Sequence, residues 1–162
     1  MERIWAPWRQ SYVSNARSDK SCIFCPDQTG KGDRERLILA RSVYSLMMLN
    51  RYPYTGGHLM VAPLRHTAEL DDLSDAELLD LMHLLGRGRA LLKRVANPDG
   101  FNVGINLGKA AGAGVEEHLH IHVVPRWNGD SNFMTVVGDV RVIPEGLMAA
   151  YDQFSAALVE DV

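Results

Sequence analysis

Apolar residues in the first half of the chain gather in two short runs of the kind that form buried strands. These runs are residues 42–49 and 58–63, and the segment between them contains Pro53 and the pair Gly56-Gly57. Short apolar runs bounded by glycine and proline are typical of strands, and one turn between two of them is typical of a hairpin. We therefore expect the two runs to pair as a β-hairpin.

A long amphipathic pattern then predicts the main helix. Ser74 and Glu77 have the S-x-x-E spacing of a capping box, in which each side chain binds the backbone N–H of the other residue. The apolar residues at helical spacing are Leu78, Met82, Leu85 and Leu92. The N-P-D-G segment that starts at Asn97 ends the helix. Gly86 and Gly88 inside it each cost about 1 kcal/mol relative to alanine, a cost that close packing would explain.

The rest of the chain predicts further strands and a last helix. The expected elements are a strand over 101–107, a glycine- and alanine-rich loop over 108–114, a strand over 116–127, a short strand near 134–137 and a helix from about Pro144. The order β-β-α-β-β-α lacks the regular alternation of a doubly wound sheet. It predicts an α+β fold with an antiparallel sheet and two main helices.

The first twenty residues are predicted to form an arm that precedes this domain. Residues 1–20 carry Trp5, Trp8 and Tyr12, which we expect to pack on the core or on a partner subunit. The whole chain has 162 residues. That length suits one domain, over 21–162, together with such an arm.

The charge of the chain argues against two broad classes of partner. The formal net charge is −3 and the isoelectric point is about 6.0, so there is no global positive field to attract nucleic acid or a membrane surface. No apolar run reaches the roughly 18 residues of a transmembrane helix, and the first residues lack the apolar core of a secretory signal. We therefore expect a cytoplasmic protein that binds neither nucleic acid nor membranes.

Half of the six histidines of the chain lie within five positions. His118, His120 and His122 alternate with apolar residues, and a strand would place all three imidazoles on one face. The alternating apolar residues, expected in the core, are Leu119, Ile121 and Val123. A row of imidazoles on one face indicates chemistry rather than packing.

Two kinds of chemistry fit this row of histidines. An H-x-H pair can bind a catalytic zinc ion. Alternatively, a neutral imidazole can attack an electrophilic phosphorus atom, provided that an acceptor holds its far nitrogen so that the attacking nitrogen carries the lone pair. The preceding loop, with Gly108, Gly112 and Gly114, can bring backbone N–H groups close to an anion. The loop and the histidines together favour phosphate chemistry.

The two cysteines, Cys22 and Cys25, form a single C-x-x-C. A redox pair of this spacing would begin a helix that follows a strand. This pair instead follows a polar run and precedes Pro26. A metal-binding knuckle is the favoured interpretation, with a redox pair as the alternative.

The H-x-H-x-H motif followed by two apolar residues, here HLHIHVV, closely resembles the signature of the histidine triad (HIT) superfamily of nucleotide hydrolases and transferases. The resemblance extends to LNRYPYTGGHLMVAPLRH and GFNVGINLGKAAG, and so covers most of residues 20–127. The segments RIWAPWR and VVPRWNGDSNFMTVVG look most like the branch that acts on diadenosine tetraphosphate, which includes phosphorylases and fragile-histidine-triad hydrolases. The resemblance implies a HIT-like fold and a homodimer.

The resemblance also implies roles for individual residues. His120 would be the nucleophile that forms a nucleotidyl-histidine at the α-phosphorus, and His122 would contact the α-phosphate and assist proton transfer. Asn50 matches the ribose-contacting asparagine of the family. The residues at the phosphate-binding positions are Asn106, Gly112, Ala113 and Gly114. The positions that match a structural zinc site in several members are Cys22, Cys25, His66 and His118.

One position departs from the family pattern and leaves the final acceptor open. Hydrolases of the family commonly have glutamine, and some phosphorylases serine, where this chain has Gly114. Water or phosphate could therefore release the nucleotide. The alternatives to a dinucleoside polyphosphate enzyme are a nucleoside phosphoramidase, a metallohydrolase and a nucleotide sensor with little turnover. His58 and His83 receive no role, and packing is expected for both.

Overall fold

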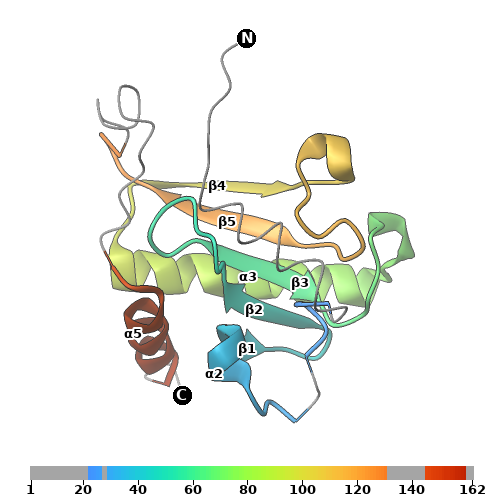
Figure 1. Cartoon of the computed structure of the whole chain (residues 1–162), viewed down its shortest axis with the longest axis horizontal. Coiled ribbons are helices and arrows are strands. Elements are labelled where there is room, and N and C mark those ends of the chain that lie inside the picture. Colours follow the sequence, from blue (N-terminus) through green and yellow to red (C-terminus); the bar gives the residue numbers. More distant parts are fainter. Residues whose placement is uncertain (1–21, 27–28, 131–144, 160–162) are drawn as a thin grey trace.

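Five strands pair into one antiparallel sheet in the order β1-β2-β3-β5-β4 (Figure 1). The computed structural model describes residues 22–26, 29–130 and 145–159. The strands are β1 Ile38–Arg41, β2 Ser45–Leu49, β3 Leu59–Pro63, β4 Gly100–Ile105 and β5 Ile121–Arg126. The helices are α2 Asp33–Arg36, α3 Asp75–Ala96 and α5 Leu147–Val159, with short 3-10 turns at Leu70–Asp72 and Lys109–Ala111. The predicted α+β class with an antiparallel sheet is confirmed.

The predicted hairpin is formed by β2 and β3. Their register pairs Ser45 with Pro63 and Leu49 with Leu59. The turn closes where the N–H of Asn50 donates to the carbonyl of His58 at 2.8 Å. The Asn50 side chain also shapes the turn, because its Oδ1 accepts the N–H of Tyr52 at 2.9 Å. The hairpin therefore holds Asn50 and His58 side by side.

Helix α3 crosses one face of the sheet and begins at the predicted capping box of Ser74 and Glu77 (Figure 1). Gly88 is buried where an added Cβ would meet the Met47 Sδ at 2.8 Å, whereas an added Cβ at Gly86 would meet nothing within 4 Å. Close packing therefore explains Gly88 and not Gly86. The predicted apolar face is wrong at Met82, whose exposed fraction is 55%.

The two faces of the sheet carry different apolar clusters. Alternate residues of β2 and β3 pack under α3, and this larger cluster contains Leu119, Ile121 and Val123 as predicted. The smaller cluster on the opposite face consists of Phe24, Ile38, Leu46, Met48, Met60 and Ala62. Both faces are therefore covered, and β2 and β3 are buried throughout.

Some elements differ from the prediction. Neither strand β1 nor helix α2 was predicted. The last helix starts at Leu147, close to the predicted start near Pro144. The arm over 1–20 and the strand near 134–137 lie outside the described residues. Within the described ranges, no helix is both long and apolar enough to cross a membrane.

Candidate active site and metal centre

The three triad histidines do not all lie on one strand. β5 begins at Ile121, so His122 belongs to it while His118 and His120 come just before it. The expectation of a single strand over 116–127 is therefore wrong at its first residues. The N–H of Leu119 donates instead to the carbonyl of Thr67 at 2.6 Å, which anchors this segment to the loop after β3. The three imidazoles consequently face different partners.

The far nitrogen of the His120 imidazole is held by an acceptor, as the predicted nucleophile requires. Its Nδ1 lies 2.8 Å from the carbonyl oxygen of His118, to which the Nδ1–H donates. The lone pair is therefore on Nε2. The ring is buried and stacks on Phe24 at a centroid distance of 4.7 Å. Burial lowers the pKa of His120, which favours the neutral imidazole, although the hydrogen bond to His118 acts in the opposite direction.

His122 lies beside His120 with its ring edge-on at a centroid distance of 4.9 Å. Gly104 of β4 and Met60 of β3 are its neighbours across the strands, and Gly104 contributes no side chain over the imidazole. The Nε2 of His122 is 3.5 Å from the amide nitrogen of Asn106. Burial, followed by the charge of His120, lowers the pKa of His122 to about 4. His122 is therefore a neutral hydrogen-bonding group at neutral pH.

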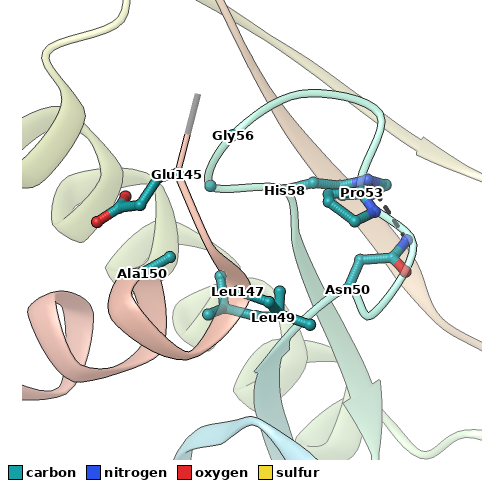
Figure 2. Close-up of a pocket in the computed structure, with 9 residues that line it drawn as sticks. Leu49, Asn50, Pro53, Gly56, His58, Glu145, Leu147 and Ala150 are labelled. Carbon is teal, nitrogen blue, oxygen red and sulfur yellow. Dashed lines mark hydrogen bonds between the residues drawn. The ribbon is translucent and has the colours of Figure 1, made fainter. Parts of the chain in front are cut away.

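His58, for which only packing is predicted, belongs to this group of imidazoles. Its exposed fraction is 0%, and its Nε2 is 3.0 Å from the Nδ1 of His122. The Asn50 amide nitrogen lies 3.4 Å from the Nδ1 of His58, and Figure 2 shows the two residues together at one wall of a pocket. Packing was correctly expected for His58, but the contact with His122 depends on the pairing of β3 with β5, which no sequence signal gave.

The pocket beside Asn50 and His58 has a volume of about 240 Å³. It is closed on the other side by Leu147 and Ala150 of α5, and the wall is largely apolar (Figure 2). The C-terminal helix therefore contributes to the surroundings of Asn50.

The glycine-rich loop after β4 is a compact turn. Gly108 and Gly112 have φ angles of 75° and 88°, which glycine adopts without strain. The N–H groups of Ala111, Gly112 and Ala113 donate to carbonyls of Gly108 and Lys109 within the loop. Contact of residues 112–114 with phosphate stays a prediction, and in this conformation the N–H groups of Gly112 and Ala113 are already bonded within the loop.

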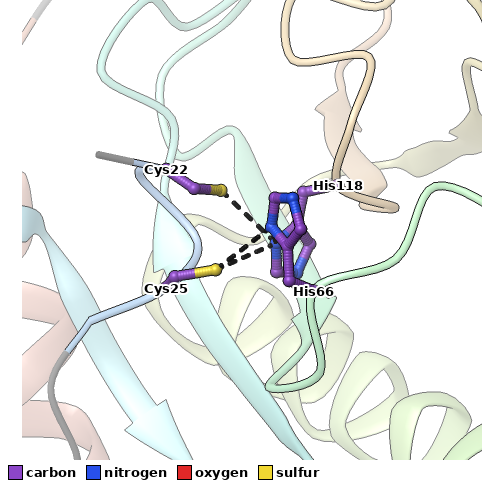
Figure 3. Close-up of side chains that lie close together, drawn as sticks. All are labelled: Cys22, Cys25, His66 and His118. Carbon is purple, nitrogen blue, oxygen red and sulfur yellow. Dashed lines mark hydrogen bonds between the residues drawn. The ribbon is translucent and has the colours of Figure 1, made fainter. Parts of the chain in front are cut away.

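Cys22, Cys25, His66 and His118 converge from three segments of the chain (Figure 3). Their candidate ligand atoms all lie within 4.8 Å of one another. The Nδ1 of His118 is 3.4 Å from each sulfur and 3.1 Å from the Nδ1 of His66. The Sγ of Cys25 is 3.3 Å from the Nδ1 of His66.

These four atoms fit a tetrahedral zinc ion. Zn–S and Zn–N bonds of about 2.3 and 2.05 Å give tetrahedral edges of roughly 3.6 Å between S and N and 3.3 Å between two N atoms. The four S–N and N–N distances above agree with these edges to within about 0.3 Å, and the two remaining pairs, Cys22 with Cys25 and Cys22 with His66, lie within 4.8 Å. The Nε2–H of His118 donates to the carbonyl of Pro63 at 2.8 Å, which leaves the lone pair on the Nδ1 that faces the cysteines. The donor set is thus suited to a closed structural site.

Comparisons with known proteins agree with this arrangement. The HIT domain family model matches residues 31–129. The chain is 43% identical to the "AP-4-A phosphorylase" of Mycobacterium tuberculosis, over 90% of this chain and 78% of the relative. It is 30% identical to the "Adenosine 5'-monophosphoramidase hnt1" of Schizosaccharomyces pombe, over 85% of this chain and 98% of the relative.

A solved structure of a relative has the same fold. The structure of a Zn-bound histidine triad family protein from Mycobacterium smegmatis matches with a TM-score of 0.67 and 31% identity, over 86% of this chain and 94% of that one. The residues matched by the family model include His118, His120 and His122. The fold resembles that of the solved neighbour. The chain therefore belongs to the HIT family.

Proposed function

We propose that this protein is an enzyme that cleaves a dinucleoside polyphosphate such as diadenosine tetraphosphate at the α-phosphorus. The similarity to the phosphorylase of Mycobacterium tuberculosis supports this substrate class. The observation that carries the proposal is the bond from the Nδ1–H of His120 to the carbonyl of His118, because it leaves the Nε2 lone pair of a neutral imidazole available.

Catalysis would proceed in two displacements at one phosphorus atom. The Nε2 of His120 attacks the α-phosphorus, a P–N bond forms, and the bond to the bridging oxygen breaks, which releases ATP from diadenosine tetraphosphate. In the second displacement an oxygen of phosphate or water attacks the same phosphorus and the P–N bond breaks. The electron pair returns to the Nε2 of His120, and the product is ADP with phosphate or AMP with water.

His122 would stabilise the charge on the reacting phosphate. Its imidazole lies edge-on to His120 and is neutral, since its pKa is lowered to about 4. A polyphosphate leaves as an anion, so a hydrogen bond from His122 suffices for the first step. Asn106, next to His122, and residues Gly112, Ala113 and Gly114 would contact the phosphates, and Asn50 would contact a ribose.

A zinc ion held by Cys22, Cys25, His66 and His118 would have a structural role. Four bonds to these residues would tie residues 22–25 to His66 and to the segment before β5. The C-x-x-C contains Phe24, which stacks on His120, and His118 provides the carbonyl that holds the His120 ring. This chain's own residues therefore position the nucleophile, and the metal would keep that arrangement together.

Product analysis of diadenosine tetraphosphate with and without phosphate tests the proposal. We expect ATP as one product of either reaction. A phosphorylase would give ADP as the second product and would turn over only when phosphate is present, whereas a hydrolase would give AMP with or without phosphate. Adenosine phosphoramidate should be run in parallel, because the fission yeast relative is a monophosphoramidase. Faster turnover of the phosphoramidate would favour that function, and tight nucleotide binding without any product would favour a sensor.

We also propose that the protein is a homodimer. Within the described residues, β4 forms the end of the sheet opposite β1 and leaves one edge unpaired, and Val103 and Leu107 there are 48% and 49% exposed. Sedimentation analysis should give twice the chain mass, and Val103→Lys should shift the protein toward monomer. A wild-type monomer at micromolar concentration would reject the dimer.

A cytoplasmic location stays a prediction, which cell fractionation would check.

A further inference from the structure

His58 is placed to control which nitrogen of His122 carries the proton. Two donors point at the Nδ1 of His58: the backbone N–H of Tyr54 at 3.1 Å and the Asn50 amide at 3.4 Å. The Asn50 amide is oriented independently, because its oxygen accepts the N–H of Tyr52. An Nδ1 that accepts hydrogen bonds carries no proton. A neutral His58 therefore has its proton on Nε2.

That proton faces His122. The Nε2 of His58 and the Nδ1 of His122 are 3.0 Å apart, which is a normal N–H···N hydrogen-bond length. Both imidazoles are neutral, since burial lowers the pKa of His58 to about 3 and that of His122 to about 4. When Nδ1 of His122 accepts, its own proton must lie on Nε2.

The ring positions are fixed by packing as well as by these bonds. The ring of Tyr54 lies 4.6 Å from His58 and stacks against His122 at 5.8 Å. The Nε2 of His122 is directed away from His58 toward Asn106. The Asn106 atom at 3.5 Å from this Nε2 is the amide nitrogen, which is also a donor, so a proton on Nε2 requires the amide to be turned by 180° with its oxygen toward His122.

We propose that His58 is a positioning residue that holds His122 as the Nε2–H tautomer, so that this N–H is available as a donor to the reacting phosphate. The chain of contacts runs from the Tyr54 N–H through His58 to His122. The part that concerns phosphate rests on the proposed function. The tautomer itself does not, because it is a property of the protein without substrate.

The decisive measurement is the ¹⁵N NMR signature of the histidine side chains in the substrate-free, full-length protein. Wild-type His122 is expected to show a protonated Nε2 and a bare Nδ1. In His58→Leu the donor to Nδ1 is lost, so we expect His122 to sample both tautomers. His58→Gln retains an amide N–H donor near the former Nε2 and should restore the Nε2–H form. His83→Leu, on the exposed surface of α3, is the matched control and should leave the His122 signals unchanged.

Kinetics of the same variants give a second readout. His58→Leu should lower kcat by about 10- to 100-fold with a much smaller change in KM, and His58→Gln should recover most of the loss. A wild-type His122 that is protonated on Nδ1 would overturn the proposal, as would an unchanged tautomer in folded His58→Leu. An equal loss of kcat in both variants with the same tautomer would also reject it, because the effect would then be structural. If no dinucleotide is turned over at all, the proposed function fails while the tautomer measurement still decides this inference.

Discussion

Replacing His120 with alanine is expected to lower the turnover of diadenosine tetraphosphate by at least about 1,000-fold, while the nucleotide still binds. The Nε2 of His120 is the atom whose lone pair the His118 carbonyl makes available, so its removal leaves no nucleophile in the same place. Intact-protein mass after mixing with substrate, with the reaction quenched at high pH to preserve P–N bonds, should show a nucleotidyl adduct on the wild type. The variant should show none.

The control for this experiment is His83→Ala, which removes an exposed histidine from α3 and should retain wild-type turnover and adduct formation. Circular dichroism and nucleotide titration establish that the His120→Ala protein is folded and binds. Substantial turnover by that folded variant would contradict covalent catalysis at His120. An adduct that forms on both proteins would place the nucleophile elsewhere.

Removing zinc is expected to lower the free energy of unfolding of the protein. Zinc at 100 times its dissociation constant stabilises the folded protein by about 2.7 kcal/mol. For a chain of this length, about 2–4 °C per kcal/mol gives a fall in Tm of roughly 5–10 °C on chelation. Elemental analysis should find one zinc per chain in the wild type and none in a Cys22→Ser/Cys25→Ser variant. The variant should have the Tm of the chelated wild type.

Chelation of the double variant is the control, because it has no site to empty and its Tm should not change. A wild type that contains no zinc, or whose Tm is unaffected by chelation, would contradict the proposed site. The nucleotidyl adduct separates a structural from a catalytic metal. We expect chelated protein still to form the adduct, because His118 still supplies its carbonyl to His120. The adduct should form more slowly, because zinc no longer holds this segment in place. A metallohydrolase would form no adduct with or without metal.

The local sequence rules predicted those parts of the fold that depend on neighbouring residues. The capping box of Ser74 and Glu77, the β2–β3 hairpin and the burial of Leu119, Ile121 and Val123 each follow from spacing within a few positions. Strand β1 was missed because it is short and follows Leu37, a core residue with a φ of 65° that no local preference predicts. Helix α2 has four residues, too few for a helical pattern.

The candidate site shows where local rules stop. The resemblance to the HIT family predicts that Cys22, Cys25, His66 and His118 form one site. In the structure their ligand atoms lie within 4.8 Å of one another. The link between His58 and His122 was not predicted, because it joins residues 64 positions apart through the register of Met60 with His122. Strand pairing sets that register, and a single sequence does not specify which strands pair.

The position of the four metal ligands along the chain has a consequence for folding. Cys25 and His118 are 93 residues apart, and His66 lies 41 residues after Cys25. β1, β2, β3, α3 and β4 all lie between the first and last ligand, so four of the five strands form within a loop that a bound ion would close. Such a cross-link reduces the conformational entropy of the unfolded chain, as a disulfide does in the chain-entropy model. Chain connectivity, more than the few contacts at the ion, would then determine how strongly the metal favours the folded state.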